Sequence, residues 1–244
     1  PGCLAALRAG LADADVVVPR VLLTGDPSRL DSCGHAMYPD GLNWCRGRGE
    51  LAAGRYEQPE EVLLASGAAV ALRRSALVAA GGLDPSFWAY GEDADLSLRV
   101  ARFGLVTRTA PGAEVLHRVG GSFGHHGLRK AFLVERNRVR VALVHLPAAW
   151  LLRAPAFTVA RLVGLGVSGA AGRGVLGGYS AGDRALLGPV LLLASLAAAF
   201  GAPGSLRRRR ALAASAGPAT PRFTAQLNAA RIGLRDLLAR PRLE

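Results

Sequence analysis

Three acidic side chains stand together where a loop is predicted to enter a helix. They are Glu92, Asp93 and Asp95, which follow directly after Gly91. The partial positive charge at a helix N-terminus stabilises ionised carboxylates in the first turn. An ionised carboxylate that faces a cleft can accept the proton of a substrate hydroxyl as that hydroxyl attacks. The same residues could instead act only as partners of the helix dipole, because acidic residues open many helices.

A second group of reactive side chains is sparser. Cys33 and His35 are two residues apart, and Cys45 follows ten residues after His35. They could form part of a zinc site, but a fourth ligand is missing and the spacing fits no usual zinc pattern. With Cys3 there are three cysteines, which give no even disulfide framework and no Cys-x-x-Cys motif. The set is typical of reduced, cytosolic thiols.

The elements that would position the acidic group have local signals in the sequence. Leucine spacing predicts a helix over residues 1–14, and a β-branched run predicts a buried strand over 15–23. A short apolar run predicts a further strand over 63–74. A helix is predicted over 75–82, ending at two glycines. These elements alternate as they do in α/β folds.

The acidic group itself opens a predicted amphipathic helix that ends at Gly104. One face of this helix is apolar, with Leu96, Val100 and Phe103. Asp95 and Arg99 are four residues apart, so they can pair and add a few tenths of a kcal/mol.

Other segments have weaker signals. Residues 24–60 show little periodicity and predict a long loop region of the kind that often binds ligands. Residues 105–117 predict two short strands around a Pro-Gly turn, and 120–127 predict a flexible link. A basic helix that becomes apolar is predicted over 129–152.

Composition divides the chain into two parts. It has 244 residues, half of them hydrophobic, and a mean hydropathy of +0.24, which excludes disordered and fibrous classes. The net charge of +12 indicates an anionic partner. Residues 1–117 carry a net charge of −3 and residues 118–244 a net charge of +15.

The region over residues 62–124 resembles the second half of a family 2 glycosyltransferase of the bacterial rhamnosyltransferase-like type, which has the GT-A fold. The resemblance rests on many ordered elements at consistent spacing rather than on one acidic pair. These elements are Gly67, Arg73-Arg74, Gly81-Gly82-Leu83-Asp84, Phe87-Trp88, Glu92-Asp93-Ala94-Asp95-Leu96, Arg99, Gly104, His117 and Ser122.

The resemblance implies roles for the acidic group. Asp93 corresponds to the carboxylate that deprotonates the acceptor hydroxyl in an inverting, single-displacement transfer. Glu92 would help to position the acceptor. Asp95 is likewise expected to bind substrate.

The resemblance also implies roles outside the acidic group. Trp88 could stack on a sugar ring, although it could equally pack beside its aromatic neighbours. Gly67 would let the backbone approach the donor sugar. His117 corresponds to the histidine that completes a divalent-metal site, for Mg²⁺ or Mn²⁺, which neutralises the leaving diphosphate. A single histidine at a strand end could otherwise be only a hydrogen-bonded structural residue.

The chain departs from the family in one large respect. These enzymes carry a nucleotide-binding half first, with an Asp-x-Asp pair that holds the metal and the donor diphosphate. Before the acidic group this chain has only Asp13-Ala14-Asp15, which reads as a helix end and is not assigned the metal role. We therefore expect a fragment that lacks roughly its first hundred residues, judged from typical domain size, and that is inactive alone.

The basic part contains two apolar stretches. Residues 185–206 are uncharged, but the densest part, 185–200, spans only about 24 Å as a helix. A bilayer core is about 30 Å thick, so a spanning helix, an interfacial or re-entrant helix pair and a soluble core helix all remain open. Residues 139–168 form a second, mainly apolar stretch, which Arg153 and Arg161 interrupt. The basic tail suits an anionic membrane surface.

The sequence thus predicts an α/β fold: a partial, Rossmann-like GT-A domain over 1–126, then a helical, basic, membrane-associated tail over 127–244. The function predicted for the full-length protein is sugar transfer from a nucleotide-sugar donor to a saccharide or lipid-linked acceptor in cell-envelope polysaccharide synthesis. Its expected location is the cytoplasmic face of the cell membrane. A non-catalytic membrane-binding or scaffolding remnant of the fold is the alternative. Nucleic acid is not an expected partner, because no recognition motif accompanies the arginines.

Overall fold

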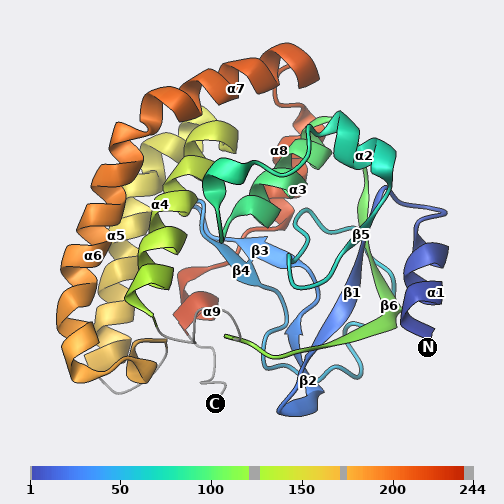
Figure 1. Cartoon of the computed structure of the whole chain (residues 1–244), viewed down its shortest axis with the longest axis horizontal. Helices are drawn as coiled ribbons and strands as arrows, with labels where there is room; N and C mark the ends of the chain where they lie inside the picture. The colour runs from blue at the N-terminus through green and yellow to red at the C-terminus, as the bar shows by residue number, and fades with distance from the viewer. Residues whose placement is uncertain (1, 121–126, 171–174, 239–244) are drawn as a thin grey trace.

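The computed structural model describes residues 2–120, 127–170 and 175–238. The strands are β1 (Val16–Leu23), β2 (Asp26–Ser32), β3 (His35–Met37), β4 (Asn43–Cys45), β5 (Ala71–Leu72) and β6 (Thr107–His117). The helices are α1 (Gly2–Gly10), α2 (Arg74–Ala79), η1 (Pro85–Phe87), α3 (Glu92–Arg102), α4 (Leu128–His145), α5 (Ala148–Ala170), η2 (Val175–Gly178), α6 (Ala181–Phe200), α7 (Ala202–Ala216), α8 (Pro221–Ala229) and α9 (Leu234–Leu238). The α/β class is confirmed (Figure 1).

The main sheet is built around β1. β6 pairs with β1 in parallel along its whole length, while β2 and β5 pair antiparallel with its two ends. The sheet is therefore mixed rather than purely parallel. A second, two-stranded sheet is formed by β3 and β4.

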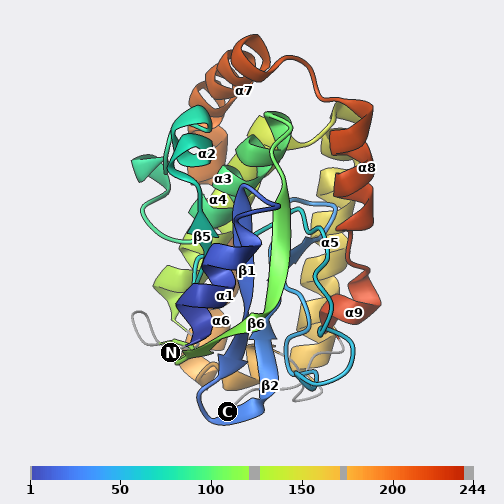
Figure 2. The same ribbon diagram turned by 90° about the vertical axis from the view of Figure 1, so that its right-hand side faces the viewer.

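Alternating side chains of β1 bury both faces of the sheet. Val17 packs with Leu7 of α1, whereas Val16 and Val18 pack with Val100 of α3. This alternation follows from the two-residue period of a strand. Figure 2 shows α1 in front of β1 and β6. Figure 1 shows α4 to α7 on the side of α3 that is away from β1 and β6.

Two helix ends follow the glycine signals of the sequence. Gly81 and Gly82 have φ of 78° and 72° and end α2, and Gly104 has φ of 74° just after α3. A positive φ costs glycine little because it has no Cβ. Asp15, by contrast, accepts a hydrogen bond from the Val106 amide at 2.9 Å and so joins the start of β1 to that of β6.

The long loop predicted over residues 24–60 is wrong. β2, β3 and β4 all lie in this range. Two of these strands are only three residues long, which is too short to show an alternating pattern. Their pairing with each other and with β1 stabilises them instead.

Two strand predictions also need correction. The strand predicted over 63–74 is reduced to β5, and the two strands predicted over 105–117 are a single strand, β6. The Pro111-Gly112 pair forms a bulge, because the register of β6 against β1 shifts from Pro19–Ala110 to Arg20–Glu114. Pro19 has no N–H to donate, which suits a position where the ladder is interrupted.

The basic half is helical as predicted, with different boundaries. The helix predicted over 129–152 is broken between α4 and α5 around Pro147, and the apolar stretch 185–206 is divided between α6 and α7. The predicted link over 120–127 falls almost wholly outside the described residues. The division into units at 126–127 stays a prediction, and contacts between α3 and α4 cross it.

Candidate functional site

The acidic group lies where a strained turn enters α3. Gly91, the residue before α3, has φ of 86°, and a Cβ there would lie 3.3 Å from the Cβ of Asn137. Trp88 and Tyr90 both have φ of 65°, which is uncommon for residues with a side chain. The Asn137 amide stabilises this backbone by donating to the carbonyl oxygens of Phe87, Ala89 and Tyr90 at 3.1, 2.8 and 2.6 Å. Asn137 of α4 therefore holds the turn that leads into α3 in place.

Asp93 is held by two backbone amides. Its Oδ2 accepts from Gly67 N at 2.9 Å, and its Oδ1 accepts from Ala94 N at 2.8 Å. A Cβ on Gly67 would lie 3.4 Å from both Cβ and Oδ2 of Asp93. Gly67 was expected to let the backbone approach a donor sugar, and in the structure it lets the backbone approach Asp93. The Asp93 side chain keeps 17% of its surface exposed, so a substrate can reach it.

Glu92 lies beside Asp93 in a less polar environment. Burial raises the pKa of Glu92, and the neighbouring Asp93 carboxylate raises it further. The expectation that the helix N-terminus would favour the ionised form is thus wrong for Glu92, because desolvation opposes it. Its Oε2 is buried and has no hydrogen-bond partner among the described residues. Glu92 as a whole is only half-buried.

Asp95 points into the protein rather than toward Asp93. It is 3% exposed, and its two oxygens contact His145 Nε2 at 2.8 Å and Arg99 Nη2 at 2.7 Å. The predicted pairing with Arg99 is confirmed. Asp95 therefore joins α3 to α4 from a buried position, and its substrate-binding role stays a prediction.

Trp88 lies at the surface of the same turn. It is 58% exposed, and the Arg129 guanidinium lies 4.4 Å from the centre of its ring. An exposed aromatic face beside the acidic group is suited to stacking on a sugar ring. Its neighbour Phe87 is 1% exposed, so the two aromatic side chains differ in burial, and the alternative that Trp88 only packs beside its aromatic neighbours stays open.

His117 ends β6 and pairs with an acidic residue of β2. Its Nδ1 lies 2.8 Å from Oδ2 of Asp31, a residue that sequence reasoning missed. Arg48 Nη1 lies 2.7 Å from Oδ1 of Asp31. Among the described residues no group of three or more His, Cys, Asp or Glu side chains could hold a metal ion. Both oxygens of Asp31 are engaged, one by His117 and the other by Arg48, so Asp31 orients the imidazole and only His117 could supply a ligand to Mg²⁺ or Mn²⁺, the others coming from phosphate or water.

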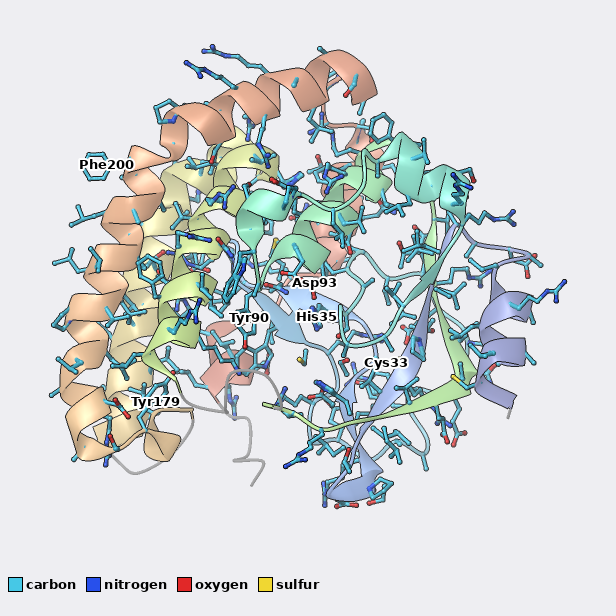
Figure 3. The ribbon with its side chains drawn as sticks, in the orientation of Figure 1. Cys33, His35, Tyr90, Asp93, Tyr179 and Phe200 are labelled. Carbon is cyan, nitrogen blue, oxygen red and sulfur yellow. The ribbon has the colours of Figure 1, made fainter. Side chains whose placement is uncertain are left out.

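A series of side chains connects these two parts of the site. Arg48 Nη1 donates to Cys45 Sγ at 3.5 Å, and His35 Nε2 lies 3.6 Å from the same sulfur. His35 Nδ1 in turn lies 3.8 Å from Asp93 Oδ2, and Figure 3 shows His35 and Asp93 side by side. The structure therefore links Asp93 and His117 through Asp31 and three residues of the range predicted as a loop.

Electrostatics couple Cys45 and His35. Burial disfavours the imidazolium of His35, but Cys45, Asp93 and Asp31 outweigh burial and raise the pKa of His35 to about 9. Burial also disfavours the thiolate, but His35 and Arg48 outweigh it and hold the pKa of Cys45 below its ordinary value. Only the proximity of Cys33, His35 and Cys45 in the sequence pointed to this cluster, and it pointed to zinc.

Comparison with known proteins supports a glycosyltransferase relationship. The chain is 34% identical over 97 residues to an N-acetylglucosaminyl-diphospho-decaprenol L-rhamnosyltransferase of Mycobacterium tuberculosis, in each of the strains CDC 1551 / Oshkosh and ATCC 25618 / H37Rv. The match covers 36% of this chain and spans 31% of the length of those relatives. No family model matches the chain.

Proposed function

We propose that the protein is an inverting glycosyltransferase of cell-wall synthesis. It transfers a sugar from a nucleotide-sugar donor to a saccharide or lipid-linked acceptor. The partial match to the mycobacterial rhamnosyltransferases supports transfer to a diphosphate-linked polyprenol, because their name specifies that acceptor. The observation that carries the proposal is the Asp93 carboxylate, fixed by two amides and accessible at the entrance of α3.

Asp93 is the general base in this proposal. As the acceptor hydroxyl oxygen bonds to the anomeric carbon, the bond from that carbon to the donor phosphate breaks and the hydroxyl proton passes to Asp93. Its position is fixed by backbone donors on both oxygens, so no rearrangement is needed before proton transfer. Inversion follows because the nucleophile and the leaving group occupy opposite faces of the sugar.

The acceptor is held by the neighbours of Asp93. The half-buried Glu92 accepts from a second hydroxyl of the acceptor, and Trp88 stacks on the acceptor ring. These two contacts position the reacting hydroxyl toward Asp93.

A divalent cation is expected at His117. The imidazole would supply one ligand, and donor phosphate oxygens and water would supply the others. When bound, Mg²⁺ or Mn²⁺ neutralises the charge that develops on the leaving diphosphate. Asp31 would orient the imidazole from behind, as carboxylates do for metal-binding histidines, and Arg48 pairs with the other oxygen of Asp31.

We place the protein on the anionic cytoplasmic face of the membrane. Two helices, Ala148–Gly169 and Ala181–Phe200, are long and apolar enough to cross a bilayer, and only 6% and 17% of their most apolar 18-residue segments are buried. They carry large exposed apolar side chains, among them Leu152, Val163, Leu192 and Phe200. Figure 3 shows Phe200 pointing away from the protein. Close by, Arg207 and Arg210 of α7 are exposed to solvent. These features suit contact with acidic lipids.

The helices lie along the membrane rather than across it in this proposal. Arg161, in the middle of α5, is 4% exposed and binds Asp40 at 2.7 Å and Glu135 at 2.8 Å. α6 packs one face against α4 through Leu187, Ala194 and Ala198. A spanning α5 would draw these charged residues into the hydrocarbon layer, which is costly.

The activity is tested by comparing Asp93→Asn with Asp13→Asn in the protein with its native ends. Asp13 is an exposed turn carboxylate and serves as the matched control. Transfer from labelled nucleotide sugars to a polyprenyl-diphosphate sugar should fall by about 10²-fold or more in Asp93→Asn, as expected for loss of a general base. Donor binding should stay unchanged. Equal turnover in both variants would refute the assignment.

The location is tested by flotation with phosphatidylglycerol and phosphatidylcholine vesicles. Arg207→Gln with Arg210→Gln should weaken binding to the anionic vesicles by about 2 kcal/mol, or roughly 30-fold. Extraction by alkaline carbonate separates the two topologies: release from native membranes is expected, and retention would indicate a span.

A further inference from the structure

Cys45 and His35 form a cross-strand pair on the two-stranded sheet. They are directly opposite each other in the antiparallel register of β3 and β4, which places their side chains on one face. His35 Nε2 lies 3.6 Å from Cys45 Sγ. The side-chain amide of Asn43 lies 3.2 Å from His35 Nδ1 and orients the ring. The imidazole is therefore aimed at the sulfur by a second group, as an activating base must be.

Positive groups surround the sulfur. Arg48 donates to Cys45 Sγ at 3.5 Å from one side, and His35 contacts it from the other. Lys130 of α4 and Asp31 of β2 also lie within electrostatic reach, and Asp93 of α3 lies beyond His35. A partly exposed cysteine between an imidazole and a guanidinium is the environment of reactive thiolates rather than of structural thiols.

We propose that Cys45 is a covalent modification site for small electrophiles, peroxides and alkyl halides among them, and that His35 activates it. With hydrogen peroxide, the sulfur attacks one peroxide oxygen and the O–O bond breaks. The leaving hydroxide takes a proton from His35 to give water. Cysteine is oxidised to sulfenic acid and the peroxide is reduced.

Modification has a consequence for Asp93. Reaction at Cys45 removes the negative sulfur that favours the imidazolium, so the pKa of His35 falls. His35 is also the cationic neighbour of Asp93, at 3.8 Å. The thiol is thereby coupled to the carboxylate at the entrance of α3 without touching it.

The other two cysteines are internal controls. Cys33 is fully buried, and burial raises its pKa to about 11. Cys3 lies in α1 and is half-buried, like Cys45, but has no part in this cluster. No disulfide joins the three, all of which lie in the described part of the chain.

The experiment measures alkylation by iodoacetamide between pH 5.5 and 9, with mass spectrometry to resolve each cysteine. At pH 6 we expect Cys45 to react about tenfold or more faster than Cys3, and Cys33 to react slowest. His35→Gln should remove the advantage of Cys45 at pH 6, and Cys45→Ser should lose the label. Dimedone trapping after peroxide treatment should mark Cys45.

Two results would overturn the proposal. One is a Cys45 rate that follows the same pH dependence as Cys3 in the unmodified protein, a comparison that needs no variant to fold. The other is a folded His35→Gln protein, checked by circular dichroism, in which Cys45 reacts as fast as before. Neither readout depends on sugar transfer, so the proposal and the enzymatic function are tested separately.

Discussion

Replacing Arg161 with Met tests how α5 is attached to the α/β part of the molecule. Arg161 donates through Nε to Asp40 Oδ2 at 2.7 Å and through Nη2 to Glu135 Oε2 at 2.8 Å. Arg138 binds the same two residues, and all four side chains of this ion cluster are at most 6% exposed. The cluster connects α5, α4 and the turn after β3.

The expected magnitude follows from burial. Met keeps the length of the side chain but leaves two buried carboxylates with Arg138 as their remaining partner in the cluster. Removing one partner from a buried ion pair costs about 3–5 kcal/mol, a large fraction of the roughly 5–15 kcal/mol that stabilises a typical domain. The exposed Arg153→Met on the same helix should change the free energy of unfolding by less than about 0.5 kcal/mol.

The assay is guanidinium unfolding followed by circular dichroism, in matched detergent for all variants. Arg161→Lys should lie between the original protein and Arg161→Met, because lysine keeps the charge without the two-point geometry. Asp40→Asn combined with Arg161→Met should cost less than the sum of the two, since they share a contact. Equal unfolding free energies for Arg161→Met and Arg153→Met would refute a buried role for Arg161. They would also contradict the attachment of α5 to α4 and to the turn after β3 through this ion cluster.

Three further changes test the site and its supports. Asn137→Ala should lower the free energy of unfolding by about 1–3 kcal/mol, because the carbonyls over residues 87–90 lose their donor, and it should weaken acceptor binding more than donor binding in titration calorimetry. Gly41→Ala should destabilise by a similar amount, since φ there is 93° and a Cβ would lie 2.9 Å from a side chain of α4. Stability should also fall as pH drops from about 7 to 4. Burial lowers the pKa of His145. Burial alone would raise the pKa of Asp95, but the hydrogen bond to His145 outweighs burial and lowers that pKa. In both cases the unfolded chain therefore takes up a proton at a higher pH than the folded protein does, so acid favours unfolding. His145→Gln should flatten this pH dependence in denaturant titrations, and an unchanged slope would contradict the assignment.

The elements that the sequence predicted are those with a complete local signal. The β-branched run of β1 favours a strand by itself, and the glycines after α2 and α3 end those helices by themselves, so each signal lies within a few residues. β3 and β4 do not, because a three-residue strand has no period to detect and exists only through its partner. The sequence predicted a turn at Pro111-Gly112, where the structure has a bulge inside β6. Only the pairing with β1 keeps the residues before and after this bulge in one strand, and that pairing leaves no local signal.

The site shows the same limit at the level of single residues. Asp93 could be selected from its place at the start of a helix and from the family resemblance, and Glu92 came with it. Asp31, which pairs with His117, and His35, which approaches Asp93, are brought in by strands far away in the sequence. Asp95 lies two residues from Asp93 and has the same side chain, yet it points inward to His145. Helical geometry separates the two by about 200°, so adjacency in the motif does not imply a shared role.

Arg153 and Arg161 in the basic, apolar half likewise look alike in the sequence and differ in the structure. In the sequence both interrupt the same hydrophobic stretch and have equal weight against a membrane span. In the structure Arg153 faces outward and Arg161 is buried against Asp40 and Glu135. The buried arginine therefore fixes which face of α5 is turned toward the protein, and it leaves Leu152 and Val163 on the outward face. A helix oriented in this way exposes its apolar side while its charge stays neutralised by the protein, which is what the proposed position along a membrane surface requires.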